Sequence, residues 1–305
     1  MLGSGGLVAL AALALAAVTG CGGDLSAGEG GVPTVVATTP QVADFVRIVG
    51  GDAIVVHQVL QVGVDPHEFE PSPADQEAIR RSRAIFENGL GLEGWVAGAV
   101  KSAGATAPVV DTSSGATLRM ASEEGSEIDP HLWHDPANAK VMVANVASGL
   151  TRAVPDRAAD IASRAARYSA ELDALDAEVR GQIETIPAGQ RKLVTNHDAL
   201  GYFTDRYGIT LVGTVIPSFD SQAELSSRQL AELVATIKAQ GVKAIFAESS
   251  LPPKTAETVA RDAGVTIVAG EDALYADSMG PPGSEGDTYL KMVRHNTRQL
   301  VTHLG

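Results

Sequence analysis

The sequence is poor in cysteine and in basic residues. Its one cysteine, Cys21, excludes a disulfide within the chain. Lysine and arginine number 23 against 37 aspartates and glutamates, which gives a net charge of −14. Nucleic-acid binding needs clustered basic side chains on the phosphates, so this balance argues against a nucleic-acid partner. It weakly favours the accumulation of cations near the surface.

Motifs typical of hydrolases and redox proteins are also absent. The chain contains no H-E-x-x-H, no G-x-S-x-G and no C-x-x-C. A G-x-G-x-x-G sequence does occur at Gly89–Gly94, after a predicted strand and before a predicted helix. Glu93 within it would repel the pyrophosphate of a dinucleotide. We therefore interpret these glycines as a strand-to-helix turn.

The apolar run near the start of the chain is too short to span a bilayer. Leu7–Val18 has the size of a signal-peptide core, whereas a spanning helix needs about 20 apolar residues. No lysine or arginine precedes this run, which departs from the usual signal peptide. The run Val18-Thr19-Gly20-Cys21 resembles a lipobox, the site of bacterial lipoprotein cleavage and lipidation. This resemblance implies a signal peptide over residues 1–20, a lipid on Cys21, and a flexible tether over residues 21–32. The alternative for Cys21 is a free thiol in a flexible tail.

Short β-branched runs alternate with helical patterns, in two sets. The predicted strands are Thr34–Thr38, Ala53–Leu60, Ala84–Glu87 and Pro108–Asp111 in the first set, and Lys192–Thr195, Thr210–Val215, Ala244–Ala247 and Val265–Ala269 in the second. Helical patterns such as Pro73–Arg83 and Arg228–Gln240 lie between them. This alternation predicts an α/β fold with parallel sheets flanked by helices.

A long helical pattern separates the two sets. Pro155 stands at its start, where a first-turn proline is favoured. Apolar residues recur there at spacings of three and four, at Ile161, Ala165, Tyr168, Leu172, Leu175, Val179, Ile183 and Ile186. We predict one long rigid linker helix over residues 155–186, between an N-terminal lobe at 33–154 and a C-terminal lobe at 187–305. The alternative is an ordinary surface helix within one domain.

Two histidines occur in the same tripeptide, Asp-Pro-His. They are His67, which follows Asp65 and Pro66, and His131, which follows Asp129 and Pro130. Proline restricts its own φ to about −65°, so each histidine is presented from a stiffened backbone. The two aspartates are candidate acceptors for an imidazole N–H, which would fix the tautomer of each ring.

His197 and Asp277 complete a candidate metal site. His197 follows the strand predicted at Lys192–Thr195, and Asp277 follows the last predicted strand. Ligands of open α/β sheets bind beyond the carboxyl ends of the strands, so two facing lobes would bring these residues to His67 and His131. Three imidazoles and one carboxylate suit a first-row divalent ion in a tetrahedral site.

Six segments of the chain resemble one protein family, in order from about Pro33 to Gly305. They are Gly63–Pro73, Asn88–Trp95, Asp129–Trp133, Asn196–Phe203, Phe246–Ser250 and Ala276–Ser278. All six are similar to motifs of the metal-binding lipoproteins of bacterial ABC importers (cluster A-I), which include zinc-specific and manganese-specific members. Three of the segments contain the histidines named above.

The resemblance implies a fold, a site and a function. The fold would be two α/β lobes joined by one rigid helix. The metal ligands would be His67, His131, His197 and Asp277, with Glu248 near the metal. His134 departs from the family, which often has an apolar or small residue there, and we expect it to be a spectator at the rim of the cleft. The protein would have no enzymatic activity. As a monomer anchored by lipid outside the cytoplasm, it would capture a metal ion and deliver it to the membrane permease of an ABC transporter.

The identity of the ion depends on two features that point in opposite directions. The imidazole of His197 favours zinc, because manganese prefers oxygen ligands and some manganese-binding relatives have glutamate at this position. Some zinc-specific members carry a histidine-rich loop, whereas Ala121–Glu127 here is acidic and lacks histidine. We expect zinc, with manganese as the alternative. A less favoured alternative is an exported His₃ zinc metallohydrolase, in which Glu248 is the base and Asp277 is not a ligand.

Overall fold

The structure is a computed structural model that describes residues 31–120, 127–221 and 226–305. The predicted signal peptide and Cys21 lie outside the described residues, as does most of the acidic segment Ala121–Glu127. Within the described part of the chain, no helix is both long enough and apolar enough to cross a membrane.

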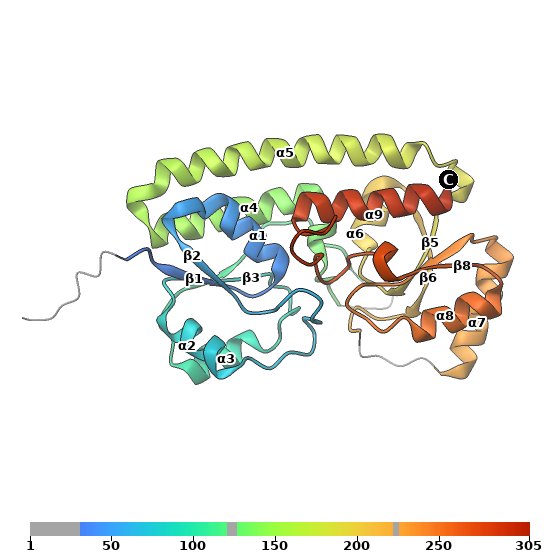
Figure 1. Ribbon diagram of the computed structural model, residues 1–305, viewed down its shortest axis with the longest axis horizontal. Coiled ribbons are helices and arrows are strands. Elements are labelled where there is room, and N and C mark those ends of the chain that lie inside the picture. Colours follow the sequence, from blue (N-terminus) through green and yellow to red (C-terminus); the bar gives the residue numbers. More distant parts are fainter. Residues whose placement is uncertain (1–30, 121–126, 222–225) are drawn as a thin grey trace, which may run out of the picture. The chain divides into compact units, whose positions relative to one another are not determined.

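The N-terminal lobe is built on a parallel sheet of four strands, in the order β2-β1-β3-β4 (Figure 1). The strands are β1 (Thr34–Ala37), β2 (Val55–Gln58), β3 (Ile85–Glu87) and β4 (Val109–Asp111), and the helices are α1 (Pro40–Gly50), α2 (Pro73–Arg81), α3 (Val96–Ala103) and α4 (Pro136–Ala153). Helices α1, α2 and α4 each begin with a proline after a side chain that caps the first turn.

The strands of this sheet separate two apolar cores. Successive strand residues point to opposite faces, so neighbouring side chains of β1 enter different cores. Val35 belongs to the core that includes the buried faces of α1 and α4. Val36 belongs to a smaller core with Ile79 of α2 and Ala99 of α3. The prediction of a parallel sheet covered by helices on both faces is therefore confirmed.

The C-terminal lobe repeats this plan with the strand order β6-β5-β7-β8. Its strands are β5 (Lys192–His197), β6 (Thr210–Ile216), β7 (Ala244–Phe246) and β8 (Thr266–Val268), and its helices are α6 (Gly201–Tyr207), α7 (Ser227–Gln240), α8 (Lys254–Ala263) and α9 (Tyr289–Leu304). Strand β5 continues past the predicted end at Thr195, because His197 still pairs with Ile216 of β6. His197 is therefore the last residue of a strand and not a loop residue, which corrects the prediction.

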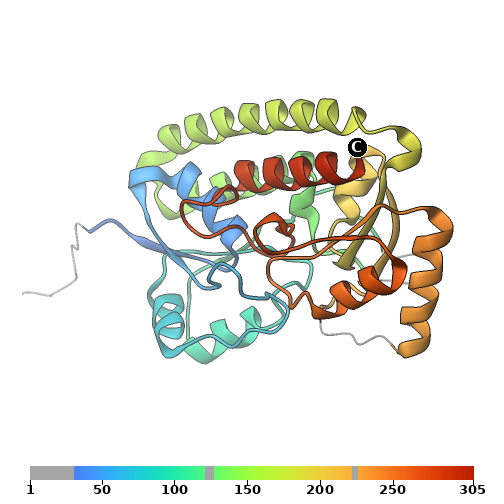
Figure 2. The same ribbon diagram turned by 45° about the vertical axis from the view of Figure 1, so that its right-hand side comes forward.

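The predicted long helix is confirmed as α5 (Ala158–Glu184), which has 27 residues and would extend about 40 Å at the usual helical rise. Pro155 begins a separate 3₁₀ turn before it. Helix α5 contacts α1 and α4 of one lobe and α9 of the other, and Figure 2 shows it alongside these helices. Six of the predicted apolar positions in α5 are buried, including Tyr168 and Leu175, and Ala165 is partly buried.

One apolar core continues from the N-terminal lobe through α5 into the C-terminal lobe. Phe45 of α1 meets the edge of Tyr289 of α9, with ring centroids 4.9 Å apart, and lies 6.1 Å from Tyr168 of α5. The main-chain N–H of Tyr289 also donates to Asp44 of α1, at 2.9 Å. These contacts fix the start of α9 against the other lobe, and the loop before α9 carries Asp277.

Candidate metal centre

Four side chains from the two lobes meet beyond the carboxyl ends of their strands. His67 comes from the loop between β2 and α2, and His131 from the segment between β4 and α4. His197 ends β5, and Asp277 lies between β8 and α9. One ligand atom from each residue can be chosen so that all four lie within 4.8 Å of one another. The structure thus brings together the four residues that the sequence singles out.

The Asp277 carboxylate lies at the centre of this group. Its Oδ1 is 3.2 Å from Nε2 of His131, and its Oδ2 is 3.1 Å from Nε2 of His197 and 3.7 Å from Nε2 of His67. All three rings therefore point the same nitrogen at one carboxylate. Asp277, His131 and His197 are buried to within 1 % of complete burial, and the His67 side chain retains 10 % exposure.

Two further carboxylates fix the rings of His131 and His197. Asp129 Oδ1 is 2.7 Å from Nδ1 of His131, and Glu248 Oε2 is 2.5 Å from Nδ1 of His197. Each carboxylate also accepts the main-chain N–H of the same histidine. A proton held on Nδ1 leaves the Nε2 lone pair free, which is the arrangement found around metal-bound histidines.

His67 is held in a different way. Asp65 Oδ1 accepts the main-chain N–H of His67 at 2.9 Å, and Asp65 Oδ2 accepts the hydroxyl of Ser221 from the other lobe. These bonds fix the backbone of the loop. The His67 ring also lines a surface cavity, together with Leu90, Pro130 and Phe219. His67 is thus the member of the group that lies nearest to solvent.

The buried side chains of this group shift one another's pKa values. Burial alone would lower the pKa of His131, but Asp277 and Asp129 outweigh it and raise this pKa to about 9. For His197 the carboxylates of Glu248 and Asp277 likewise outweigh burial and raise the pKa well above its usual value. Burial lowers the pKa of His67. Burial would raise the pKa of Asp277, but His197 and His131 hold it well below its usual range.

This arrangement suits a divalent metal ion. Three neutral imidazoles and one carboxylate form the nitrogen-and-oxygen ligand set of first-row divalent ions. A buried carboxylate needs a positive partner, and a divalent ion would replace the protons that the imidazoles otherwise hold. The aspartate and glutamate behind His131 and His197 would strengthen both rings as ligands.

His134 does not lie at the rim of a cleft, which corrects the expectation from the sequence. It is 1 % exposed, its ring lies beside that of Trp133, and burial lowers its pKa to about 3. A short 3₁₀ turn, Leu132–His134, carries it into the interior. It is not a member of the four-residue group.

The glycine-rich sequence Gly89–Gly94 is the turn that the sequence predicts. The main-chain N–H groups of Asn88 and Gly89 donate to the carboxylate of Glu93, at 2.8 and 3.3 Å. The loop therefore already binds a carboxyl group of its own chain, where a dinucleotide would need to place its phosphates. The Asn88 side chain in turn donates to the carbonyl of Pro130, at 2.9 Å, and steadies the backbone before His131.

The loop that carries Asp277 is fixed by both lobes, through residues that the sequence did not single out. The indole N–H of Trp133 donates to the carbonyl of Ala276 at 3.2 Å. The N–H of Gly63 donates to the hydroxyl of Ser278 at 2.7 Å. Asp277 thus lies between two bonds from the N-terminal lobe. Trp133 and Ser278 occur within the family motifs, but nothing in their spacing indicates this contact.

Comparison with known proteins identifies the family. Residues 35–303 match the family described as the periplasmic component A of the zinc-uptake complex, ZnuA. The chain belongs to this family of metal-binding proteins of ABC importers. The zinc-binding protein TroA of Treponema pallidum is 34 % identical over 303 residues, which cover 96 % of each chain. The manganese-binding lipoprotein MntA of Bacillus subtilis is 34 % identical over 307 residues, which cover 98 % of this chain and 99 % of MntA.

The fold agrees with this membership. The solved structure of the periplasmic zinc-binding protein TroA superposes with a TM-score of 0.83 at 32 % sequence identity, and it covers 90 % of this chain and 100 % of TroA. Proteins of this family bind a solute for uptake and are not enzymes, so the metallohydrolase alternative is wrong. The site gives a physical reason, because both oxygens of Glu248 are engaged by His197 and neither is free to activate a water.

Proposed function

We propose that this protein captures one zinc ion at His67, His131, His197 and Asp277 and delivers it to the permease of an ABC importer. The observation that carries the proposal is the convergence of three imidazole Nε2 atoms on the carboxylate of Asp277. Four protein ligands would enclose the ion completely, as in structural zinc sites, and would leave no position for a reactive water. A closed site of this kind is suited to carrying an ion.

Zinc is the preferred ion because three of the four ligands are imidazoles. An N/O site of given geometry binds zinc more tightly than manganese, and manganese favours oxygen. The alternative, manganese, has support as well. Both oxygens of Asp277 face the centre, so a fifth ligand atom is available to an ion of higher coordination number. Relatives of similar identity are named for zinc and for manganese.

We further propose an extracytoplasmic protein that is held to the membrane through a lipid on Cys21. The lipobox-like sequence supports this, and several relatives are named as lipoproteins. Mature residues 21–32 would form the tether, and a monomer of two lobes, at 33–154 and 187–305, would be joined by the helix at 155–186. Cys21→Ser should release the protein from the membrane fraction, and unchanged membrane retention would count against the anchor.

The metal assignment can be tested on the purified mature chain. Native mass spectrometry should detect one zinc ion per chain. Competition titration with a chromogenic chelator should then give the affinities for zinc and for manganese. The variant His197→Glu exchanges one imidazole for a carboxylate and should narrow the gap between the two affinities.

Two results would separate the parts of this proposal. Tighter binding of manganese than of zinc by the unaltered chain would overturn the choice of ion and keep the carrier function. Absence of stoichiometric binding of either ion would overturn the site itself. His57→Ala is a suitable control, because this partly buried histidine pairs with Asp75 at 2.7 Å and is not a member of the four-residue group.

A further inference from the structure

Arg119 lies in the N-terminal lobe, and its guanidinium group is surrounded by carboxylates from both lobes. Nη1 is 3.0 Å from Asp129 Oδ2 and 3.7 Å from Asp198 Oδ1, and Nε is 3.1 Å from Asp205 Oδ2. Asp129 belongs to the same lobe, whereas Asp198 and Asp205 belong to the C-terminal lobe. The Arg119 side chain is 20 % exposed and that of Asp129 is buried, so water screens this pair little. The Asp205 side chain is 68 % exposed, so its pair with Arg119 is largely screened.

The C-terminal lobe provides a fitted position for this side chain. Helix α6 begins with Gly201, and a Cβ atom at this residue would collide with the guanidinium carbon and nitrogens of Arg119. The next residue, Tyr202, accepts the main-chain N–H of Arg119 with its hydroxyl at 2.9 Å, and this hydroxyl donates to the carbonyl of Asp129 at 2.9 Å. Both the backbone and the side chain of Arg119 are thus held by the other lobe.

The carboxylates around Arg119 lead directly to the metal site. Asp129 is 0 % exposed and divides its two oxygens between Arg119 and Nδ1 of His131. Asp198 follows His197 in the sequence. One guanidinium therefore touches a carboxylate next to a proposed ligand in each lobe. Without it, the buried carboxylate of Asp129 would lose its arginine partner in the protein interior, which is costly.

We infer that Arg119 is a positioning residue, which aligns Asp129 on His131 and couples that alignment to the contact between the lobes. This inference rests on the proposed function. While α6 and its aspartates hold Arg119, Asp129 keeps the His131 ring aimed at the ion. Separation of the lobes would remove Asp198, Asp205 and the position over Gly201 from Arg119. It would thereby loosen Asp129 and His131 at the moment when the ion must leave.

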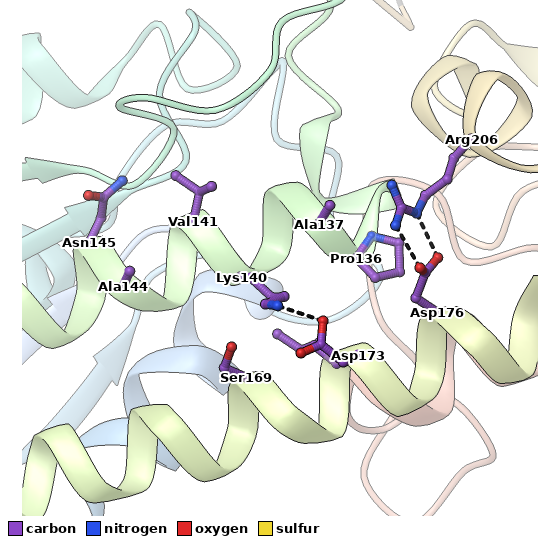
Figure 3. A pocket seen from close by; sticks show the side chains of 11 residues that line it. Pro136, Ala137, Lys140, Val141, Ala144, Asn145, Ser169, Asp173, Asp176 and Arg206 are labelled. Atoms are coloured by element: carbon purple, nitrogen blue, oxygen red, sulfur yellow. Dashed lines mark hydrogen bonds and ion pairs between the residues drawn. The ribbon is translucent and has the colours of Figure 1, made fainter.

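Arg206 provides a matched control, because it is also an arginine that crosses between the lobes. Its guanidinium is 23 % exposed and binds Asp176 of α5 through two bonds of 2.6 Å, which Figure 3 shows. Its Nε lies 3.1 Å from Asp135, in the N-terminal lobe. Within the described residues, neither Asp176 nor Asp135 bonds to any of the three histidine rings of the site. A purely structural role would make Arg119 and Arg206 equivalent.

The test compares Arg119→Gln, Arg119→Lys, Gly201→Ala and Arg206→Gln with the unaltered mature chain. Zinc dissociation is measured by stopped flow into excess chelator. The visible spectrum of the cobalt(II)-loaded protein reports the geometry of the ligands, and thermal unfolding of the metal-free protein reports stability. Loss of a group that supports a metal ligand typically weakens metal binding by about 10- to 100-fold.

We expect Arg119→Gln to speed zinc dissociation by about that factor and to change the cobalt spectrum. Gly201→Ala should change the rate in the same direction but less, because the guanidinium can move away from the added methyl group while the arginine is still present. Arg119→Lys should be intermediate because an ammonium cannot reproduce the fork. Arg206→Gln should lower the unfolding temperature but leave the zinc dissociation rate and the cobalt spectrum unchanged.

Equal dissociation rates for Arg119→Gln and Arg206→Gln, or a cobalt spectrum that is the same in both, would overturn the inference and leave the proposed function intact. If Arg119→Gln does not fold, Gly201→Ala and Arg119→Lys decide by the same criteria. An unaltered chain that binds neither zinc nor cobalt would overturn the proposed function and this inference together.

Discussion

His67 and His131 each end an Asp-Pro-His tripeptide, but they differ in burial, in the bonds to their rings and in the direction of their pKa shifts. His131 is completely buried, and Asp129 holds both its ring and its backbone. The ring of His67 is partly exposed at a surface cavity, and the bond from Asp65 reaches its backbone. The pKa of His131 is raised to about 9 by Asp277 and Asp129 against the effect of burial, whereas burial lowers the pKa of His67.

The difference shows that a motif can specify a ligand type without specifying how firmly the ligand is held. Asp-Pro-His presents an imidazole from a stiff loop in both places. The surrounding lobe then determines whether the ring is fixed or accessible. We expect His131 to be a fixed anchor of the ion and His67 to be the ligand through which the ion enters and leaves.

The largest effect should come from removal of the two rings. His131→Ala should weaken zinc binding by more than about 100-fold, since it removes a ligand and also leaves Asp129 without its imidazole. His67→Ala should weaken binding less, and mainly through faster dissociation. Chelator competition and stopped-flow dissociation measure both quantities. Equal losses for the two variants would contradict the distinction between anchor and entry ligand.

Substitution of the aspartate in each tripeptide should weaken zinc binding more at Asp129 than at Asp65. Asp129→Asn removes the charge behind His131 and should weaken zinc binding about 10- to 100-fold. Asp65→Asn keeps an oxygen that can accept the main-chain N–H of His67, so its effect should be much smaller. Zinc titration of the two variants, side by side, measures the difference. A larger loss of zinc affinity for Asp65→Asn than for Asp129→Asn would contradict the assignment of His131 as the anchor and His67 as the entry ligand.

Acidification should release the ion, mainly through the buried rings. The raised pKa values of His131 and His197 mean that protons compete with the ion at and below neutral pH, and each displaced proton changes the affinity about tenfold per pH unit. Affinity should therefore fall steadily from pH 8 to pH 6. His67→Ala should keep this pH dependence, because the pKa of His67 is lowered. Affinity that does not change over this range would exclude a site of three imidazoles.

The last effect concerns stability and not metal binding, at the loop that supports His131. Burial raises the pKa of Glu93 from 4.5 to about 7 despite the bonds it accepts. The folded state then binds the proton more tightly than the unfolded state, so its contribution to stability is present below pH 4.5 and is lost as the pH rises to about 7. The loss should amount to about 3 kcal/mol.

Glu93→Gln should remove this part of the pH dependence. Urea unfolding of the metal-free protein at pH 5 and pH 7.5 measures it in the parent and the variant. The loops of His67 and Asp65 receive no bond from Glu93 within the described residues, so zinc dissociation controlled by His67 should be unchanged. Parallel pH profiles for parent and variant would show that Glu93 stays ionised when buried.

The fold was largely predictable from the sequence, because its determinants are local. The run from Ile161 to Ile183 has helical periodicity, and six of its predicted apolar side chains are buried in α5. The end of β5 was predicted two residues too early, since asparagine and histidine have little tendency to form strands. Pairing with β6 extends the strand regardless, and local propensity cannot detect it.

The candidate ligands could be predicted from the sequence, whereas the residues that support them could not. His67, His131, His197 and Asp277 lie in family motifs at the ends of predicted strands. Arg119, Trp133 and Gly201 act through contacts between residues 83 to 143 positions apart along the chain, or through the absence of a side chain. No periodicity or spacing encodes such contacts. The burial of His134 was missed for the same reason.

The central claim is that one divalent ion is bound by three imidazoles and one carboxylate contributed equally by the two lobes. The most direct test is a crystal structure of the zinc-loaded mature chain, with anomalous diffraction measured on both sides of the zinc absorption edge. We predict one zinc peak, within about 2.0–2.2 Å of Nε2 of His67, His131 and His197 and of a carboxylate oxygen of Asp277. A zinc peak elsewhere, or a zinc ion that is not coordinated by Asp277 or by one of the three rings, would contradict the account.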